Sequence, residues 1–366
     1  MIVNENKTKI VHFRPKNQNV TNYQFMFHNK SLEVIHEYRY LGIILTENLD
    51  FQRTAKLLAE AGGRAFGMVR NKLQQLKEFR YSTFSKLYNM HVRPILEYGS
   101  EIWGYKSQSK IDNIQHRAVR FYFGVHRFAP IHMLEGDIGW VSSICFRHVN
   151  ICKFYNRIIK MSPDRLTRKV FEYDLSLCKN NWSFELKQIL SSVGCNDVIQ
   201  NRTAINIGLV KQALQQLYCE KWENTRFNKP KLRYYNIYKI SHSLENYAKN
   251  CSSRLKRSTL AQFRGGILPI NVEIGRFRNI ALESRLCTLC NSNLVEDEFH
   301  VLCICDVYSE IRKTLYDSIC QIDENFHNYD DFEKFVFVNN EHQFLLANYL
   351  CKAMKIRKNL LFESNQ

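Results

Sequence analysis

The chain has 366 residues, of which 45% are hydrophobic and 24% are charged, and this composition excludes a wholly disordered protein. Lys and Arg number 52 against 35 Asp and Glu, which gives a formal net charge of +17. Such an excess of positive charge is typical of proteins that bind polyanions. We therefore expect RNA and DNA as partners.

The positive charge is unevenly distributed along the chain. Residues 51–125 carry a net charge of +8 and residues 201–286 carry +11, whereas residues 1–50 and 126–200 carry only +1 and +3. Residues 287–366 are acidic, with a net charge of −6. Two separate binding faces are expected from this pattern rather than a uniform basic coat.

Targeting signals and disulfides are not indicated. No apolar leader follows Met1, and no run of about 18 uncharged apolar residues occurs, so we expect no membrane association. Five of the twelve cysteines fall between Cys287 and Cys320, which favours reduced thiols, some of them metal ligands. We expect an intracellular protein, in the nucleus and/or the cytoplasm.

The first 46 residues predict short strands. Runs rich in Val, Ile, Tyr and Phe predict strands of one small antiparallel sheet, with a turn at Asn29–Lys30. These runs are 7–13, 23–27, 32–35 and 38–45.

Beyond Asp50 the apolar spacing changes to that of helices. Three amphipathic stripes with basic outer faces lie within 58–76, 84–95 and 111–122, and they predict a helical bundle. The pair Gly62–Gly63 marks a kink or a close approach, and Pro94 interrupts the second stripe.

More helices are expected in the middle of the chain. The ranges are 140–161, a helix starting at Ser162–Pro163, 184–191 and 205–222, with linkers around Asn180 and Gly194. The fold class is therefore α+β and mostly helical.

A basic and aromatic segment follows at 228–239. Its lysines and arginine alternate with Tyr234, Tyr235 and Tyr238, so the segment predicts either nucleic-acid binding or an edge strand with solvated charges. A second basic group follows at Arg254, Lys256, Arg257 and Arg264.

Cys287, Cys290, His300 and Cys305 form the strongest local motif. Two pairs, Cys-x2-Cys and His-x4-Cys, offer three sulfurs and one nitrogen, which is a closed tetrahedral set for structural zinc. Cys303 is an alternative to Cys305 as the fourth ligand, and reduced cysteines without metal are the alternative to zinc.

Two groups of carboxylates are weaker indications of a functional site. Residues 296–298, Glu-Asp-Glu, predict a solvated turn or a group that supports His300. Asp330–Asp331 predict the start of a helix rather than a polymerase metal site, because no aromatic residue stands at Asn328. The motifs of nucleophile triads, P-loops and dinucleotide sites are missing from the sequence.

Several segments form an ordered set of motifs along the chain. They are Asn4-x-x-Lys7-Thr8-Lys9, Tyr38-Arg39-Tyr40-Leu41-Gly42-Ile43, Arg93-Pro94-Ile95-Leu96-Glu97-Tyr98-Gly99-x-x-Ile102-Trp103-Gly104, Ile114-Gln115-x-x-Ala118-x-Arg120, and Phe263-Arg264-x-Gly266-x-Leu268-Pro269-x-x-x-Glu273-x-Gly275-Arg276. The cysteine–histidine motif with Glu296-Asp297-Glu298-Phe299-His300 follows them. In combination, these segments resemble the carboxy-terminal part of the endonuclease and reverse transcriptase polyprotein of non-LTR (LINE-type) retrotransposons.

The resemblance implies a protein related to RNA-directed DNA polymerases. It implies five segments: a palm remnant at 1–46, a helical thumb at 50–125, a helical connector at 126–227, a basic aromatic region at 228–286, and a zinc knuckle with an acidic helical tail at 287–366. The family's aromatic-x-Asp-Asp hairpin, which holds Mg²⁺, would precede Met1, so we expect no catalytic residue and no enzyme activity from this chain alone.

Nucleic-acid contacts are expected from arginines in the thumb and beside the knuckle. They are Arg64, Arg70, Arg117, Arg120, Arg254, Arg257, Arg264 and Arg276. The expected function is nucleic-acid binding. The alternatives are a chain that completes an active reverse transcriptase with separate palm and fingers, and a degenerate remnant without a role.

Overall fold

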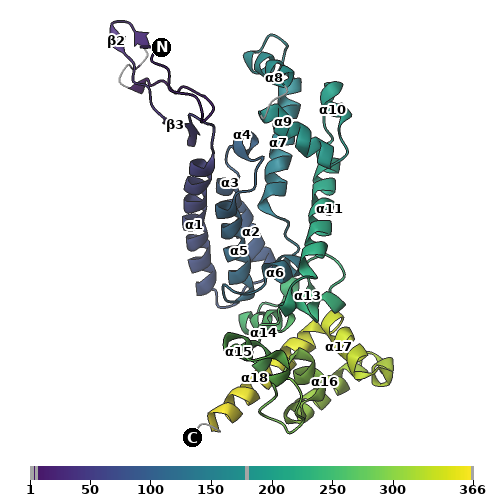
Figure 1. Ribbon diagram of the computed structural model, residues 1–366. Helices are drawn as coiled ribbons and strands as arrows, with labels where there is room; N and C mark the ends of the chain where they lie inside the picture. Colours follow the sequence, from purple (N-terminus) through teal and green to yellow (C-terminus); the bar gives the residue numbers. More distant parts are fainter. Residues whose placement is uncertain (1–3, 5–6, 178–180, 364–366) are drawn as a thin grey trace. The chain divides into compact units, whose positions relative to one another are not determined.

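The computed structural model describes residues 4, 7–177 and 181–363. Helices dominate these residues (Figure 1), with 62% of the chain helical and 5% in strands. This content confirms the expected α+β, mostly helical class. The linker predicted around Asn180 lies outside the described residues.

The chain divides into two compact units, each built from three stretches of sequence. Unit 1 comprises Met1–Phe66, His91–Ile114 and Ser143–Ala213, and unit 2 comprises Gly67–Met90, Gln115–Ser142 and Leu214–Gln366. Three of the five boundaries fall well inside the helices α1 (Gln52–Gln75), α5 (Ser109–Phe123) and α11 (Ile207–Arg226). The predicted thumb segment therefore contributes residues to both units.

The strands of unit 1 form two separate hairpins. They are β1 (Met26–Phe27), β2 (Lys30–Ser31), β3 (Glu37–Tyr40) and β4 (Ile43–Thr46), paired β1 with β2 and β3 with β4, both antiparallel. Residues 7–13 contribute only a single bridge, from Ile10 to Val34. The expectation of one continuous sheet is therefore wrong.

The predicted strand at 38–45 is divided by a tight turn. Leu41 and Gly42 both have positive φ angles, +47° and +86°, which is the backbone of a two-residue hairpin turn. The Tyr98 hydroxyl donates to the Leu41 carbonyl at 2.8 Å and fixes this turn. Beyond the turn, Thr54 of α1 hydrogen-bonds to the backbone of Ile44, so the hairpin is anchored to the first helix.

Helices complete unit 1. They include α3 (Arg93–Leu96), α4 (Ser100–Trp103), α7 (Ser143–Ile159), α8 (Leu166–Ser176), α9 (Trp182–Ser192) and α10 (Asp197–Gln200). Gly62 marks a close approach within α1, because a Cβ atom there would lie 2.3 Å from Leu96 Cδ2. Pro94 lies in the first turn of α3, where proline is tolerated, and the preceding helix ends at His91.

The helix predicted to start at Ser162–Pro163 begins later. The amide of Arg165 donates to the Ser162 carbonyl at 3.0 Å, which closes a turn before α8 starts at Leu166. The proline therefore belongs to a turn and not to the first helical turn.

Unit 2 contains the remaining elements. They are α2 (Tyr81–His91), α6 (Ile131–Ile138), η2 (Pro230–Leu232), α12 (Tyr235–Tyr238), α13 (Asn246–Asn250), α14 (Arg254–Arg264), α15 (Asn271–Phe277), η3 (Leu282–Ser284), η4 (His300–Ile304), η5 (Asp306–Tyr308), α16 (Ser309–Cys320), η6 (Glu324–Asn328), α17 (Asp331–Asn340) and α18 (Gln343–Glu363). Helix α18 packs against α14, α16 and α17. An aromatic cluster joins α2 to α5, since Phe84 stacks on both Tyr122 and Trp140.

The carboxylates at 330–331 begin a helix, as predicted. The Asp330 side chain accepts the amide of Glu333 at 2.8 Å, and the Glu333 side chain accepts the amide of Asp330 at 2.9 Å. This reciprocal capping box satisfies amides that the first helical turn leaves without partners.

Candidate metal centre and nucleic-acid interface

A short antiparallel bridge places the first two cysteines of the metal motif. Leu286 pairs with Val295, and the Cys287 amide donates to the Leu294 carbonyl at 2.8 Å. Cys290 lies in the connecting loop, where Asn293 takes a positive φ of +56° that Asn tolerates well. The loop therefore returns the chain sharply beside both thiols.

The second pair of ligands comes from the π-helical turn η4. His300 starts this turn and Cys305 follows it, with the Cys305 amide donating to the His300 carbonyl at 2.8 Å. The His300 amide donates to Asp297 Oδ1 at 2.8 Å, which fixes the start of the turn. A π-helical turn is wider than an α-helical one, so it brings His300 and Cys305, five positions apart, to the same side of the chain.

The four side chains converge as a tetrahedral site requires. The donor atoms of Cys287, Cys290, His300 and Cys305 lie within 4.8 Å of one another. Cys290 Sγ is 3.4 Å from His300 Nε2, close to the ~3.5 Å edge that Zn–S and Zn–N bonds of ~2.3 and ~2.05 Å give a tetrahedron. A hydrogen bond between Cys287 and Cys305 lowers the pKa of the Cys287 thiol and raises the pKa of the Cys305 thiol, so the two sulfurs share a proton that a bound metal would displace. The arrangement is compatible with structural zinc.

Cys305, not Cys303, lies in this cluster. Cys303 Sγ instead donates to the Asp331 carbonyl at 3.4 Å, and burial raises the pKa of its thiol to about 12. The geometry decides between the two cysteines, because Cys303 Sγ bonds to the first residue of α17 and Cys305 Sγ lies among the four donor atoms.

Glu296 and Glu298 are buried and Asp297 is half-buried, so the solvated turn is wrong, whereas the alternative, a group that supports His300, fits the bond from the His300 amide to Asp297. Glu296 Oε2 accepts from Arg357 and from the Asn271 amide, both at 2.7 Å, and Glu298 pairs with Arg233. Burial also raises the pKa of Glu298 to about 7. Together with the hydrogen bond between Asp297 and His300, these contacts fix the position of the segment that carries the metal ligands.

The eight predicted nucleic-acid arginines differ in exposure. Four are exposed, namely Arg64, Arg70, Arg117 and Arg254. Arg120 and Arg276 are half-buried. Arg120 donates to the Ala129 carbonyl at 3.5 Å, and Arg276 lies 3.4 Å from Glu273.

Arg257 is a correction to the predicted set, because its side chain is fully buried. Its Nε donates to the Tyr122 carbonyl at 2.8 Å and its Nη1 to the Cys251 carbonyl at 2.7 Å. The guanidinium also lies 4.2 Å from the centre of the Tyr122 ring. These bonds hold α14 against α5 within unit 2 and leave no surface for a phosphate.

Arg264 is a second correction, with 1% of its surface exposed. Its Nε and Nη2 bind Asp137 at 2.8 and 3.2 Å, and this carboxylate also accepts the hydroxyls of Tyr235 and Tyr247. Burial without such partners would be very costly for both charges. The network is therefore part of the core of unit 2.

The basic aromatic segment at 228–239 is helical and not an edge strand. It forms the turns η2 and α12, with the side chains of Tyr235 and Tyr238 buried. Three of its four cations pair with carboxylates: Lys231 with Glu273, Arg233 with Glu298, and Lys239 with Glu245, whereas Lys229 is exposed. The edge-strand alternative is therefore wrong, and most of the charge that suggested nucleic-acid binding takes part in ion pairs inside unit 2.

An exposed arginine group remains around Phe121, and we call it the Phe121 patch: Arg70, Arg117, Phe121 and Arg254. The guanidinium carbons of Arg70 and Arg254 lie 5.9 and 5.5 Å from the centre of the Phe121 ring, and Arg117 precedes this ring by one helical turn. Among the described residues, none of these arginines has a carboxylate within ion-pair distance. In the sequence, Phe121 falls in the apolar stripe at 111–122, and only the fold brings α1 and α14 to it.

The chain matches no family model, and comparisons with curated proteins and with solved structures give no significant match. Within the described part of the chain, no helix is both long and apolar enough to cross a bilayer.

Proposed function

We propose that this chain is a nucleic-acid-binding protein with a structural zinc site, related to the non-catalytic part of non-LTR reverse transcriptases. The observation that carries the proposal is the Phe121 patch. Planar guanidinium groups bind phosphate oxygens, and these three are exposed around the half-buried Phe121 ring, which itself stacks against Phe79. Three cations without carboxylate partners leave local positive charge that a nucleic acid would neutralise.

Binding of labelled single-stranded and duplex oligonucleotides, measured by fluorescence anisotropy at several salt concentrations, tests this proposal. The triple variant Arg70→Gln, Arg117→Gln, Arg254→Gln should reduce the slope of log affinity against log salt by about 0.9 for each lost contact on duplex. The matched control is Lys352→Gln, Lys355→Gln, Lys358→Gln, which removes three exposed charges from α18. Equal slopes for the triple variant and the wild type would contradict the assignment.

Zinc in the Cys287, Cys290, His300 and Cys305 site would have a structural role. Four protein ligands fill the tetrahedron and leave no position for substrate, so the metal would stabilise the fold rather than catalyse a reaction. The four residues come from two short segments that secondary structure alone holds weakly, and a metal would join them.

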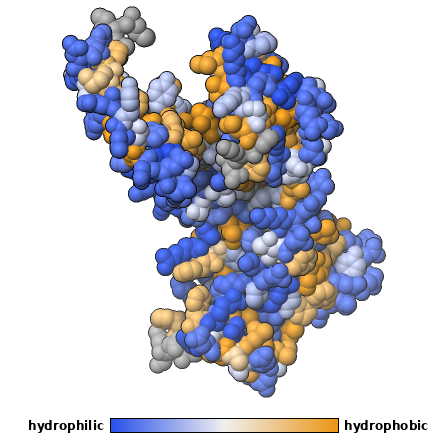
Figure 2. All heavy atoms as spheres, turned by 45° about the horizontal axis from the view of Figure 1, so that its top comes forward, coloured by the Kyte–Doolittle hydropathy of each residue, from blue (hydrophilic) through white to orange (hydrophobic). Residues whose placement is uncertain are grey.

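Completion of a polymerase by a second chain is the other candidate function, favoured by the apolar surface of the amino-terminal hairpins. Tyr23, Met26, Tyr40 and Leu41 are 53–73% exposed, and Figure 2 shows hydrophobic side chains among polar ones in this segment. Primer extension with the chain alone, and then with a palm and fingers fragment added, separates the two. Extension only in the mixture supports the second function, and extension by the chain alone contradicts both.

A further inference from the structure

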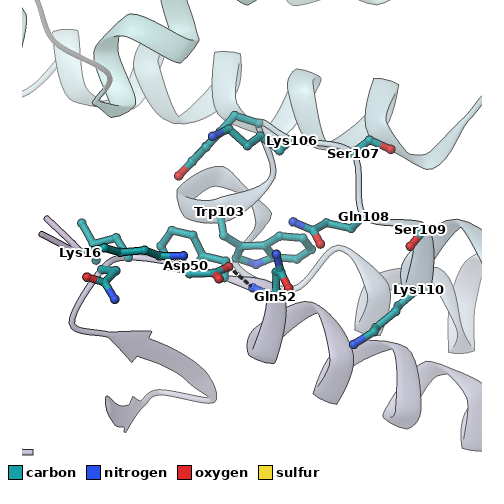
Figure 3. A pocket seen from close by; sticks show the side chains of 13 residues that line it. Lys16, Asp50, Gln52, Trp103, Lys106, Ser107, Gln108, Ser109 and Lys110 are labelled. Atoms are coloured by element: carbon teal, nitrogen blue, oxygen red, sulfur yellow. Dashed lines mark hydrogen bonds between the residues drawn. The ribbon is translucent and has the colours of Figure 1, made fainter. Parts of the chain in front are cut away.

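A polar pocket in unit 1 has no role in the function proposed above. It has a volume of about 550 Å³ and lies between the loop that leads into α1 and the loop that joins α4 to α5. Lys16 lines it from the amino-terminal loop, and Lys106 and Lys110 line it from the stretch between α4 and the start of α5, around Trp103 (Figure 3). Lysines from separate parts of the chain therefore share one concave surface.

The lining has an excess of positive charge. Its three lysines face a single carboxylate, Asp50, so the formal charge of the lining is +2. Asp50 Oδ1 already accepts the amide of Gln52 at 3.0 Å, and Lys106 lies 3.7 Å from Glu185 outside the lining. No carboxylate pairs with Lys16 or Lys110 among the residues that the structure describes.

Two long helices begin at this pocket, which adds to its positive potential. Gln52 is the first residue of the 24-residue α1 and Ser109 the first of the 15-residue α5, and both line the pocket. First-turn amides have no acceptor inside their own helix, and the helix dipole favours an anion at this end. The helix ends and the lysines thus act in the same direction.

The pocket also contains an unsatisfied acceptor and aromatic walls. Asn48 Oδ1 is buried and has no hydrogen-bond partner, although Asn48 lines the pocket. A buried acceptor of this kind is costly unless a donor reaches it. The rings of Phe51 and Tyr105 pack edge to face, with 6.5 Å between their centroids, and they supply apolar surface beside the lysines. A ligand with an anionic group, a donor and a flat ring matches these features.

We infer that this pocket binds the phosphomonoester of a nucleotide, such as the 5′-phosphate end of a nucleic-acid strand. A phosphomonoester carries about two negative charges at neutral pH, which matches the lining, whereas an internal phosphodiester carries one. Only the choice of a strand as carrier of the phosphate rests on the proposed function. A free nucleoside 5′-monophosphate would present the same phosphomonoester group to the pocket.

The test compares two short single-stranded oligonucleotides of one sequence, with a 5′-phosphate or a 5′-hydroxyl, by anisotropy of a 3′ label. The wild type should bind the phosphorylated strand about tenfold more tightly, the effect of one charge-assisted hydrogen bond. The variant Lys16→Gln, Lys110→Gln should lose this preference. The control Lys153→Gln, Lys160→Gln, two exposed lysines of unit 1, should keep it.

The outcomes separate this site from the Phe121 patch. The triple arginine variant should bind both strands more weakly but retain the preference for the phosphorylated one. Displacement of the phosphorylated strand by nucleoside 5′-monophosphate, and not by the unphosphorylated nucleoside, would support the same pocket with a free nucleotide as ligand. A wild type without preference, or a lysine variant that keeps it while circular dichroism shows a native fold, would overturn the inference.

Discussion

Arg254, Arg257 and Arg264 lie on one helix, α14, and have different roles. Arg257 and Arg264 are seven residues apart and therefore share a helix face with the buried Leu260 and Ala261, whereas Arg254 is exposed. This seven-residue spacing is visible in the sequence. Buried arginines are rare, however, so the net charge of the segment favours a surface role for both side chains. Their carbonyl and carboxylate partners come from distant segments, and no local pattern predicts those partners.

Replacement of Arg264 by Gln should strongly destabilise the chain. The variant leaves Asp137 buried without its cation, and breaking a buried pair in this way costs about 3–5 kcal/mol in the free energy of unfolding. Urea denaturation followed by circular dichroism measures the change. Arg254→Gln on the same helix is the control, with an expected change within about 0.5 kcal/mol. Similar stabilities for the two variants would show that Arg264 is not a core residue.

Gly62 and Gly67 of α1 should respond in opposite directions to substitution by Ala. At Gly62 the new Cβ would lie 2.3 Å from Cδ2 and 3.0 Å from Cγ of the buried Leu96, so Gly62→Ala should cost about 1–3 kcal/mol. At Gly67 nothing lies within 4 Å, and Gly67→Ala should gain up to about 1 kcal/mol of helix propensity. Melting temperatures that shift the same way would contradict the close approach.

His242 should make stability depend on pH. Burial beside Tyr218 and Trp222 lowers the pKa of His242 to about 4, from an ordinary value near 6.5. Between these values the unfolded chain binds more protons, so the stabilisation is present above pH 6.5 and is lost as the pH falls toward 4. The upper limit is about 3 kcal/mol. His242→Phe should flatten the unfolding free energy over this window, and an unchanged profile would assign the pH dependence to other groups.

At the scale of elements, helices were easier to predict than strands. The apolar stripe at 111–122 falls within α5, and the stripe at 58–76 falls within α1 except for Leu76, because a three- to four-residue period repeats over many turns. The strands are only two or four residues long, and a single turn at Leu41–Gly42 changes their pairing. The helical turns at 230–238 depend on ion pairs with Glu273 and Glu298, which lie more than 30 residues away.

The metal element gives a direct test of ligand identity. Cys305→Ser should abolish tight binding of one equivalent of zinc, because it removes one sulfur of the cluster, whereas Cys303→Ser should retain the metal. Metal analysis after dialysis measures the stoichiometry, and cobalt substitution would report tetrahedral sulfur ligation. Zinc retained by Cys305→Ser and lost by Cys303→Ser would reverse the assignment of the fourth ligand.

At the scale of the whole molecule, the net charge of +17 is a poor guide to where anions bind. Several of the sixteen Lys and Arg residues in 201–286 pair with buried or half-buried carboxylates, including Lys231, Arg233, Lys239 and Arg264. Spacing alone predicted the metal ligands because they are close in sequence. The Phe121 patch and the lysine pocket assemble from distant segments, so composition indicated an anion-binding protein without indicating its surfaces.

Neutralisation of the acidic tail should therefore have little effect at physiological salt. The variant Glu310→Gln, Asp317→Asn, Glu341→Gln removes three exposed carboxylates of unit 2 and raises the formal net charge by three. If separate patches decide binding, its affinity for an oligonucleotide should stay within about twofold of wild type at ~150 mM salt, where the Debye length is about 8 Å. Near ~10 mM salt the length grows to about 30 Å, and binding should then tighten measurably. Anisotropy titrations at both salt concentrations measure this, and a large gain in affinity at ~150 mM would mean that total charge, not the Phe121 patch, governs association.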